Sequence, residues 1–572
     1  MKKNLLTLLS VLLISTASFA QFKVLATGNG FEEPEDGYAK IIQEKSGYTF
    51  FLHVTIKEGI NVRIYDKNHQ QVAEKHITPD YGKLRVGKGK GAMGGVQGIY
   101  EINKNIVLFL SEYDDGGIPT LYRMIIDGVT GNLLEEKTIG TLNKLRFVDG
   151  YASVFGKVPT PAFYVRKDPE SDNYAVALFN SFASDRNERI ELVHYNKDHQ
   201  EISRAFYQSP DNDYKYLNFM DLCVRGDKEI VAVVVGMNTR SSGGDLNGTL
   251  LMGSLKAGAK SFDLQRIVYP DAGKIAESMI RYNKTKDEYI LISVKPGKDK
   301  TDKNARGYRT VIKSVGAEAT TTMINSGPIN RIANKHYDKK DQFLAIPQIL
   351  YLNDDGSYTI VFEENRAVAG TSGGMVYSSN AITTVSNTTG RMSSSPGFTY
   401  SGAGGSAPSF YLEDIGIIEY NADGTEKGTY YIPKSQKVRE IPRAIYYSFR
   451  DETGIKLIDG NQFKSFYFFN GKDKRYVLMN DIAKNQDKVD DGKKVTTIQG
   501  LDECEAYSFE IGNGENMPKR KLVFEDKEHK KEKDMALFAI SDFDRENNVL
   551  VTMKLEHVKR DKEVKLVWLQ PE

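Results

Sequence analysis

Short apolar runs separated by polar turns follow one another along nearly the whole chain. The runs contain about four to eight residues, are rich in Val, Ile, Tyr and Phe, and alternate with clusters of Gly, Asn and Asp. This pattern predicts β-strands. Clear examples are residues 48–56, 60–65, 105–110, 229–235 and 289–294. Helical periodicity is not sustained anywhere, and only residues 275–280 suggest a helical turn, so the pattern predicts an all-β protein.

A hairpin-like unit repeats within this pattern. Each copy consists of an apolar strand that ends in Tyr or Asp, a polar turn, and a return strand, as in residues 62–77, 122–139, 190–207 and 415–432. Glycines in the turns supply the positive φ angles that tight hairpins need. Most copies follow another strong strand, so blocks of about four strands recur roughly every 50 to 80 residues.

A single four-stranded sheet cannot bury both of its faces, whereas a ring of such sheets can. On the pattern of these blocks the chain resembles the β-propeller superfamily, over nearly all of its length. We therefore expect a propeller of about seven four-stranded blades, within a range of six to eight. The expected blade starts are near residues 38, 98, 150, 216, 276, 346 and 440. Residues after 505 would form an eighth blade or close the ring; a string of β-sandwiches is the alternative, but it would need linkers that the sequence lacks.

The first twenty residues have the pattern of a cleaved signal peptide. Lys2 and Lys3 precede an apolar run at 5–14, and small residues at 18 and 20 fit a cleavage site before Gln21. The apolar run is too short for a membrane anchor, and no later segment has about 18 uninterrupted apolar residues. We therefore expect a mature chain of residues 21–572 with no transmembrane segment. Its expected location is the periplasm, with release from the cell as the alternative.

Residues 367–409 interrupt one repeat with a segment rich in Gly, Ser and Thr, which is typical of a flexible insertion. Such an insertion could be an arm that binds a partner, a lid, or a solvated loop without a role. The polar stretches 484–494 and 525–534 are interpreted as solvated loops.

The charges are balanced, with 77 Lys and Arg against 76 Asp and Glu. A nucleic-acid-binding protein normally shows a basic excess or stripe, so no nucleic-acid partner is expected. The chain has only two cysteines, Cys223 and Cys504. One widely separated pair is not a disulfide framework, and both a single bridge and two free thiols are compatible with the sequence.

Two glycine-rich motifs resemble catalytic or cofactor-binding signatures in spelling only. Residues 89–94 match a dinucleotide-binding pattern, but a strand rather than a helix is expected after them. Residues 370–374 match a nucleophile elbow, but they lie in the expected insertion and not between a strand and a helix. We therefore assign no catalytic and no cofactor-binding residues.

Metal ligands are equally hard to assign. The eight histidines show no i, i+4 pair, although His194 and His199 flank one predicted turn. The acidic stretches 487–492 and 542–548 lack the closing carboxylate of a calcium loop. No metal site is assigned, and calcium binding stays open. The histidines are His53, His69, His76, His194, His199, His336, His529 and His557.

Named propeller families carry recurring motifs: the Trp-Asp repeats and the quinone-dependent dehydrogenases have many tryptophans, and the sialidases have Asp boxes. This chain has one tryptophan, Trp568, and residues 353–358 resemble an Asp box only faintly. We therefore predict a non-enzymatic periplasmic propeller that binds protein, as a scaffold or plug that docks to an envelope or outer-membrane protein. In its leader and its all-β body it is similar to accessory subunits of outer-membrane secretion machines. The alternatives are a glycan hydrolase or lyase with carboxylates in the central funnel, and a glycan-binding protein with exposed tyrosines.

Overall fold

The computed structural model describes most of the chain after its first 21 residues. The predicted leader and the motifs at 89–94 and 370–374 lie outside the described residues. The described residues are 22–55, 58–80, 95–113, 118–144, 161–238, 248–269, 275, 277–295, 302–337, 343–368, 409–438, 454–457, 463–472, 474–501, 504–524, 533–558 and 561–572.

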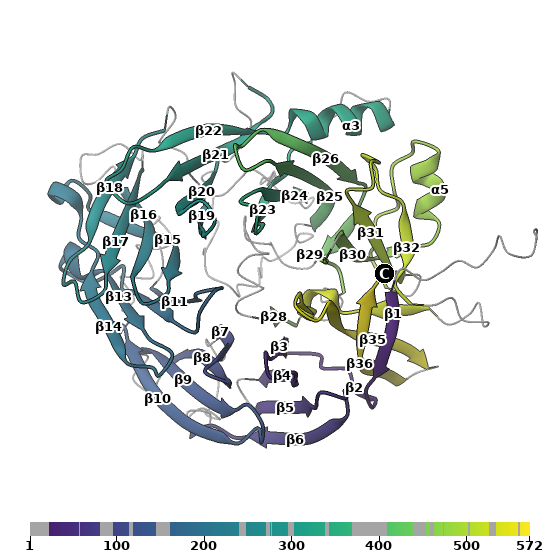
Figure 1. The fold of residues 1–572 in the computed structure, drawn as a ribbon, viewed down its shortest axis with the longest axis horizontal. Coiled ribbons are helices and arrows are strands. Elements are labelled where there is room, and N and C mark those ends of the chain that lie inside the picture. Colours follow the sequence, from purple (N-terminus) through teal and green to yellow (C-terminus); the bar gives the residue numbers. More distant parts are fainter. Residues whose placement is uncertain are drawn as a thin grey trace, which may run out of the picture.

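Eight antiparallel sheets stand in a ring around a central opening, so the fold is a β-propeller (Figure 1). Within a blade the strands follow one another from the centre outward, and the strand at the outer edge leads to the centre of the next blade. The prediction of an all-β propeller with four-stranded blades is confirmed. The ring has eight blades rather than about seven, which is the upper end of the predicted range.

The first four blades begin at residues 38, 95, 162 and 216, and three of these starts agree closely with the sequence pattern. Their strands are β3 (Tyr38–Gln43), β4 (Thr49–Thr55), β5 (Gly59–Tyr65) and β6 (Gln71–Ile77) in blade 1; β7 (Gly95–Ile102), β8 (Asn105–Tyr113), β9 (Pro119–Asp127) and β10 (Leu133–Thr141) in blade 2; β11 (Ala162–Lys167), β12 (Tyr174–Phe179), β13 (Ile190–Tyr195) and β14 (Glu201–Phe206) in blade 3; β15 (Tyr216–Arg225), β16 (Glu229–Met237), β17 (Thr249–Lys256) and β18 (Asp263–Ile267) in blade 4.

Blades 5 and 6 begin at residues 277 and 346 as expected, but blade 7 begins at 466 and not near 440. Residues after 505 are shared between blades 7 and 8. The strands are β19 (Glu277–Asn283), β20 (Glu288–Val294), β21 (Ala305–Ile312) and β22 (Thr320–Asn325) in blade 5; β23 (Ile346–Leu352), β24 (Tyr358–Val368), β25 (Ser409–Tyr420) and β26 (Glu426–Ile432) in blade 6; β29 (Phe466–Asn470), β30 (Arg475–Ile482), β31 (Cys504–Ile511) and β32 (Arg520–Leu522) in blade 7; β33 (Asp534–Ala536), β34 (Asp542–Asp544), β35 (Val549–Val558), β36 (Asp561–Pro571) and β1 (Phe22–Thr27) in blade 8.

Three short strands and two helices extend this frame. Strand β2 (Phe31–Glu32) pairs with β36, β27 (Gln436–Val438) with β25, and β28 (Ile455–Lys456) with β3. Helices α3 (Gly327–Tyr337) and α5 (Asn485–Asp490) lie outside the ring of strands at blades 6 and 7 (Figure 1). Three single 3₁₀ turns complete the elements: η2 (Arg186–Glu188), η3 (Pro210–Asn212) and η6 (Phe538–Ile540).

Three expectations for local structure were wrong. Residues 277–280 of the suspected helical turn instead begin strand β19, which pairs antiparallel with β20. The acidic stretch 484–494 contains helix α5 rather than a solvated loop. Helix α3 was not expected at all.

Pairing between the first and last strands of the described chain closes the ring. Strand β1 pairs antiparallel with β36, so that Phe22 lies opposite Pro571 and Val24 opposite Leu569. The Phe22 side chain is 1% exposed, and its ring centroid lies 5.4 Å from that of Tyr476 in blade 7. The outer strand of blade 8 therefore comes from the beginning of the described chain.

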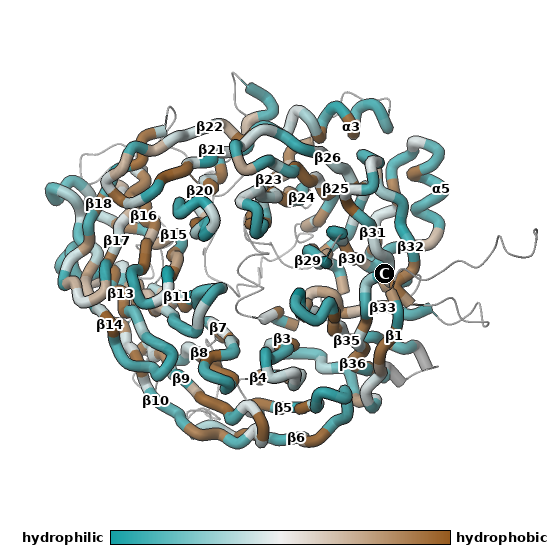
Figure 2. Tube along the Cα trace, viewed as in Figure 1, coloured by the Kyte–Doolittle hydropathy of each residue, from teal (hydrophilic) through white to brown (hydrophobic). Residues whose placement is uncertain are grey.

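The hydrophobic core consists of layers between neighbouring blades. Ile64 of blade 1 and Ile126 of blade 2 share one layer, and Leu192 of blade 3 and Val234 of blade 4 share another. Figure 2 shows the hydrophobic stretches distributed through all parts of the ring. Burying each such side chain contributes about 1.5–3 kcal/mol, so each blade depends on both of its neighbours for stability.

A buried ionic chain also joins the inner strands of blades 3, 4 and 5. The Asp221 carboxylate accepts from Arg166 Nε at 3.0 Å and from Arg281 Nη1 at 3.0 Å, and the backbone N–H of Ile280 donates to it at 3.1 Å. Asp221 is 1% exposed and lies at a bulge in β15. A bulge turns a side chain away from the regular alternation, here toward both neighbouring blades.

The repeated hairpin turns have the backbone geometry that the sequence indicated. The same turn position has a positive φ in four blades, at His69 (61°), Gly131 (69°), His199 (62°) and Gly424 (85°). Glycine takes this conformation without cost, whereas the two histidines are held in it by contacts. The His69 ring stacks on Trp568 at 4.8 Å, and His199 Nδ1 lies 3.1 Å from the Tyr174 hydroxyl.

Candidate functional site

The two rims of the propeller differ. Strand direction alternates within each blade, so the loop between the second and third strands emerges on the same rim as the connection to the next blade. We call this the connection rim; its described parts include residues 78–80, 142–144, 326–337, 343–345, 433–438, 454–457 and 463–465. The opposite turn rim has short hairpins, such as 66–70 and 196–200. Since long loops on a rigid scaffold commonly carry function, the connection rim is the candidate functional face.

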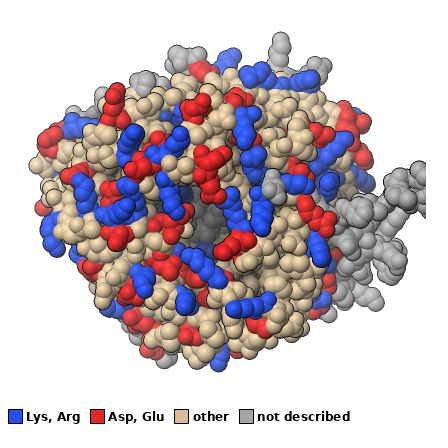
Figure 3. Space-filling view, in the orientation of Figure 1, with Lys and Arg blue, Asp and Glu red and all other residues tan. Residues whose placement is uncertain are grey.

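The central opening is bordered by both signs of charge. On the face shown in Figure 3, Lys and Arg side chains alternate with Asp and Glu side chains around the central hollow. The connection between blades 6 and 7 also reaches this region, because β28 pairs with β3 of blade 1, with Ile455 opposite Ala39. The inner strand of blade 1, β3, is therefore covered by β28 from the connection between blades 6 and 7.

Blade 6 has the longest hairpin on the connection rim. Strands β24 and β25 continue to pair as far as Val368 and Ser409, and β27 joins β25 along this extension. The Gly/Ser-rich insertion predicted at 367–409 thus begins where the hairpin ends. Residues 369–408 themselves lie outside the described part of the chain.

An irregularity in this hairpin gathers carboxylates. Glu363 pairs with Ile415, but the next paired residues are Asn365 and Leu412, so Glu364, Glu413 and Asp414 lie at a bulge. Neighbouring cations accompany two of the acids. The Arg366 guanidinium binds Glu413 with two bonds of 2.9 and 2.7 Å, and Lys434 Nζ forms an ion pair with Glu363. The Lys434 and Glu363 side chains are 1% and 0% exposed, so this pair is fully desolvated.

Two of these carboxyl groups hold their protons more tightly than usual. The pKa of Glu364 is raised to about 8, mainly by burial and also by the negative charges of Asp414 and Glu413. Burial raises the pKa of Asp414 to about 6, although the Tyr431 hydroxyl and the Lys434 backbone N–H donate to its carboxylate. Near neutral pH Glu364 is therefore mostly protonated and Asp414 mostly ionised. Raised pKa values of this kind occur in acid–base residues and also in structural carboxyl clusters.

A cavity of about 240 Å³ lies beside this hairpin, between α3 and α5. Both helices belong to connection-rim segments, since α3 precedes blade 6 and α5 lies between the second and third strands of blade 7. The cavity has an apolar floor and polar walls. Its lining residues are His336, Pro433, Asp481, Asn485, Gln486, Val489, Asp490, Phe509, Met517, Pro518, Lys519 and Arg520.

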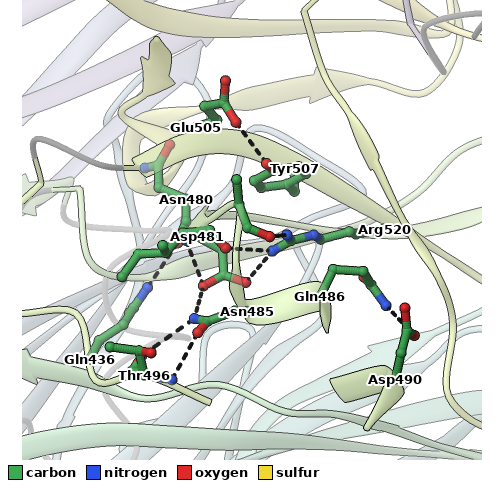
Figure 4. A network of polar contacts seen from close by, with 12 residues as sticks. Gln436, Asn480, Asp481, Asn485, Gln486, Asp490, Thr496, Glu505, Tyr507 and Arg520 are labelled. Carbon is green, nitrogen blue, oxygen red and sulfur yellow. Dashed lines mark hydrogen bonds and ion pairs between the residues drawn. The ribbon is translucent and has the colours of Figure 1, made fainter. Parts of the chain in front are cut away.

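A hydrogen-bond network fixes one wall of the cavity (Figure 4). Asp481 accepts from Asn485 Nδ2 at 2.6 Å and from Arg520 Nη1 at 2.5 Å, and Asn485 in turn accepts from the Thr496 backbone at 2.8 Å. The Arg520 guanidinium also lies 4.0 Å from the Tyr507 ring centroid. These contacts attach α5 to the strands of blade 7. Asp481 and Arg520 neutralise each other's charge in this ion pair.

The residues singled out in the sequence do not form a shared site. His194 Nε2 lies 2.9 Å from the Gly226 carbonyl oxygen, whereas His199 faces Tyr174, so the two histidines have separate partners. Burial lowers the pKa of His199 to about 4. Cys223 and Cys504 are buried free thiols in blades 4 and 7, so the two cysteines do not form a disulfide bridge.

The acidic stretches considered for calcium have structural roles instead. Residues 487–490 belong to α5, and Asp544 accepts from the Asn547 backbone and side chain in a hairpin turn. Within the described ranges, no group of three or more His, Cys, Asp or Glu side chains is placed to hold a metal ion. Of the helices that the structure describes, none has the length and apolar character to cross a membrane.

The carboxylate bulge and the α3–α5 cavity were not found from the sequence. Their residues are far apart along the chain, as the 71 positions between Glu363 and Lys434 show. The one available signal was in α3, where Pro328 is followed by Ile329, Ile332 and Ala333 at helical spacing. That segment was passed over because it is short and lies between strong strands.

Comparison with known proteins gives no family. No protein-family model matches the chain, and no curated protein matches it. Among solved structures it is similar to a europium-containing methanol dehydrogenase, with 11% identity, a TM-score of 0.36 and coverage of 82% of this chain and 88% of that one. It is also similar to an endo-arabinase from Bacteroides thetaiotaomicron, with 10% identity, a TM-score of 0.25 and coverage of 50% and 96%.

The WD40 domain of SCAP from fission yeast is a third such structure, with 8% identity, a TM-score of 0.25 and coverage of 96% of this chain and 98% of that one. At these identities and TM-scores none of the three assigns a function to this chain. The chain is an eight-bladed β-propeller by its own strand pairing.

Proposed function

We propose that this propeller is a non-enzymatic periplasmic protein that binds another protein through its connection rim, as a scaffold or plug on an outer-membrane or secretion complex. The difference between the two rims is the observation that carries the proposal. Short turns occupy one rim, whereas the other has the long connections, both helices and the Gly/Ser-rich insertion. A rigid ring that presents long segments on one side is suited to docking rather than to transport of a small ligand.

The experiment removes the insertion and follows the partner. Residues 369–408 are replaced by a two-residue turn, and the tagged protein is purified from mildly solubilised native envelopes. The control variant carries Lys197→Glu and Lys260→Glu, two substitutions on the turn rim. We expect one stoichiometric partner with the wild type and the control, and at least tenfold less of it with the deletion, at an unchanged melting temperature.

Two results would contradict this proposal. Recovery of the partner by the deletion variant would exclude the insertion as the binding arm. Recovery of the wild-type protein alone, from envelopes that were never dissolved by strong detergent, would contradict docking altogether.

The second candidate is a glycan-active hydrolase or lyase, and the two neighbouring carboxyl groups with raised pKa values in the blade 6 hairpin favour it. Glycoside hydrolysis commonly uses two carboxyl groups of different pKa, one of them raised enough to be protonated at neutral pH. Glu364 and Asp414 have that property, although they lie in the blade 6 hairpin. A glycan screen with wild type and Glu364→Gln separates the candidates, since only an enzyme would release product and lose this with the variant.

Glycan binding by exposed tyrosines has less support. Every tyrosine whose side chain the structure describes is buried or half-buried. Several of these rings pack on other rings, such as Tyr269 on Tyr308 at 4.6 Å and Tyr358 on Tyr420 at 4.9 Å. Stacking on a sugar would therefore require tyrosines from outside the described part of the chain.

A further inference from the structure

The α3–α5 cavity combines an apolar floor with one unsatisfied polar wall. Its floor is formed by Pro433, Val489, Phe509, Met517 and Pro518. Phe509 is 5% exposed, and Met517 packs against the core layer between blades 5 and 6. Such a floor can cover the methylene groups of a long side chain, which prefers to keep only its charged end near polar atoms.

The polar wall favours a cation. Nε2 of His336 is buried, and among the described residues it has no hydrogen-bond partner. Burial lowers the pKa of His336, although the Asp490 carboxylate opposes this, so the ring is neutral at pH 7 and can accept a hydrogen bond. His336 also lies in the last turn of α3, where the carbonyl ends of a helix carry partial negative charge.

Among the acidic residues of the lining, Asp490 is the one placed to bind that cation. Asp481 and Arg520 neutralise each other at 2.5 Å, and Arg520 donates further to the Ile482 carbonyl at 3.0 Å. Asp490 is exposed at the cavity and accepts one bond, of 2.9 Å, from Gln486. Lys519 is the other charged lining residue that is exposed. The network of Figure 4 therefore holds the wall in place, and it engages Asp490 through the single bond from Gln486.

The volume sets the size of the occupant. Sites for drug-sized ligands measure roughly 300–1,000 Å³, whereas this cavity measures about 240 Å³. A single extended side chain fits such a space. Two of the elements that line it, α3 and α5, belong to connection-rim segments, whereas residues 517–519 belong to the turn between β31 and β32. We infer that the α3–α5 cavity receives a lysine or arginine side chain of the protein partner, with its stem on the apolar floor and its charged end between His336 and Asp490.

This inference rests on the proposed protein-binding function, and it identifies the chemistry of one contact in it. Hydrogen bonds connect the segment beside the cavity to β26 of blade 6, because Tyr431 N–H donates to the Asn516 carbonyl at 2.8 Å and Asn516 Nδ2 donates to the Thr429 carbonyl at 2.7 Å. A partner segment in the cavity would therefore lie next to β26.

The test uses the full-length protein and N-acetyl-arginine-N-methylamide, a probe whose only charge is the guanidinium. Binding is titrated by ligand-observed NMR at pH 7, and the citrulline analogue serves as a probe of equal shape without charge. Two variants accompany the wild type. Asp490→Asn removes the carboxylate at the cavity, and Asp487→Asn makes the same change on α5 at a residue that does not line it.

We expect saturable binding of the arginine probe with a dissociation constant in the millimolar range, at least fivefold weaker with Asp490→Asn and unchanged with Asp487→Asn. The citrulline probe should bind at least fivefold more weakly than the arginine probe. Equal binding of both probes, an equal effect of both variants, or no saturable binding of the arginine probe would overturn the inference.

The outcome is separable from that of the proposed function. If the wild type retains its envelope partner but the arginine probe does not bind, the cavity assignment is wrong and docking stands. If the probe binds as expected but no partner is recovered, the cavity still takes a basic side chain and the docking proposal is wrong. Asp490→Asn in the envelope purification then measures how much this contact contributes, with Asp487→Asn as its control.

Discussion

Asp221 shows how one residue can hold three blades together. Its carboxylate is fully buried and meets two guanidinium groups that lie 55 and 60 positions away in sequence. A charged group in such a place is costly to bury but still more costly to leave without its partners. The effect of removing it should therefore be large although no hydrophobic contact is lost.

Asp221→Ala should lower the free energy of unfolding by about 3–5 kcal/mol, since the buried Arg166 and the half-buried Arg281 would each lose this ion pair. Urea denaturation at pH 7 measures this. Asp263→Ala is the matched control, because Asp263 pairs with Lys256 at 2.8 Å on the surface, where its side chain is 62% exposed. The control should change stability by less than about 1 kcal/mol. A similar loss in both variants would contradict a special role for Asp221.

At the residue scale the sequence predicts the backbone conformation of turns better than it predicts which charged residues pair. Gly131 and Gly424 were recognisable as positive-φ positions because the requirement is local. His69 and His199 occupy the same position, and this was not recognisable since each depends on an aromatic ring far away in the chain. The pairing of Asp221 with its arginines depends in the same way on the closed ring.

The blade 6 hairpin is the element in which stability should depend most clearly on pH. Glu364 has a pKa of about 8 in the folded protein against an ordinary value of 4.5, so the folded state holds its proton more tightly. Such a group stabilises the fold fully below its unfolded pKa, and this contribution is lost as the pH rises through the folded pKa. Asp414, with a pKa of about 6, acts in the same direction.

Stability of the wild type should therefore fall between pH 5 and pH 8.5, and Glu364→Gln should remove on the order of 1–3 kcal/mol of this dependence. Urea denaturation at four pH values across the interval measures it. Glu170→Gln, an exposed acid on the turn rim paired with Lys284, should leave the dependence as it is. A wild type that becomes more stable toward pH 8.5 would show that the carboxyls are ionised in the fold.

Element by element, strands were predictable where both faces are covered by neighbouring blades. Their apolar runs are long, and five of the seven expected blade starts lie within about three residues of the observed ones. Helix α3 was missed because only one face of its three turns touches the core, at Ile329 and Ala333. The start of blade 7 was misplaced because the connection of 433–465 itself contributes β27 and β28 to other blades.

For the whole molecule, the decisive contact is that between β1 and β36. Deleting residues 22–27 would expose the edge of β36 and remove Phe22 from its place between Phe469 and Tyr476. We expect a clear drop in melting temperature and self-association through the open edge. A synthetic peptide of sequence FKVLAT, added in excess, should restore part of the stability, whereas a scrambled peptide should not.

No effect of the deletion on the melting temperature would mean that the ring is held by the inter-blade layers alone.

The number of blades, eight rather than seven, could not have been decided from the sequence, because the eighth blade takes its outer strand from the opposite end of the chain. Its inner strand is also divided, into β33 and β34, with η6 between them.

The same closure sets a schedule for folding. Phe22 and its partner Pro571 lie near opposite ends of the described chain, so the seal cannot form until both of these ends have been synthesised. At about 5–20 residues per second the chain waits roughly half a minute to two minutes in an open form. Contacts so distant in sequence also form slowly. During that time the polypeptide exposes two unpaired strand edges, which are prone to pair with other chains.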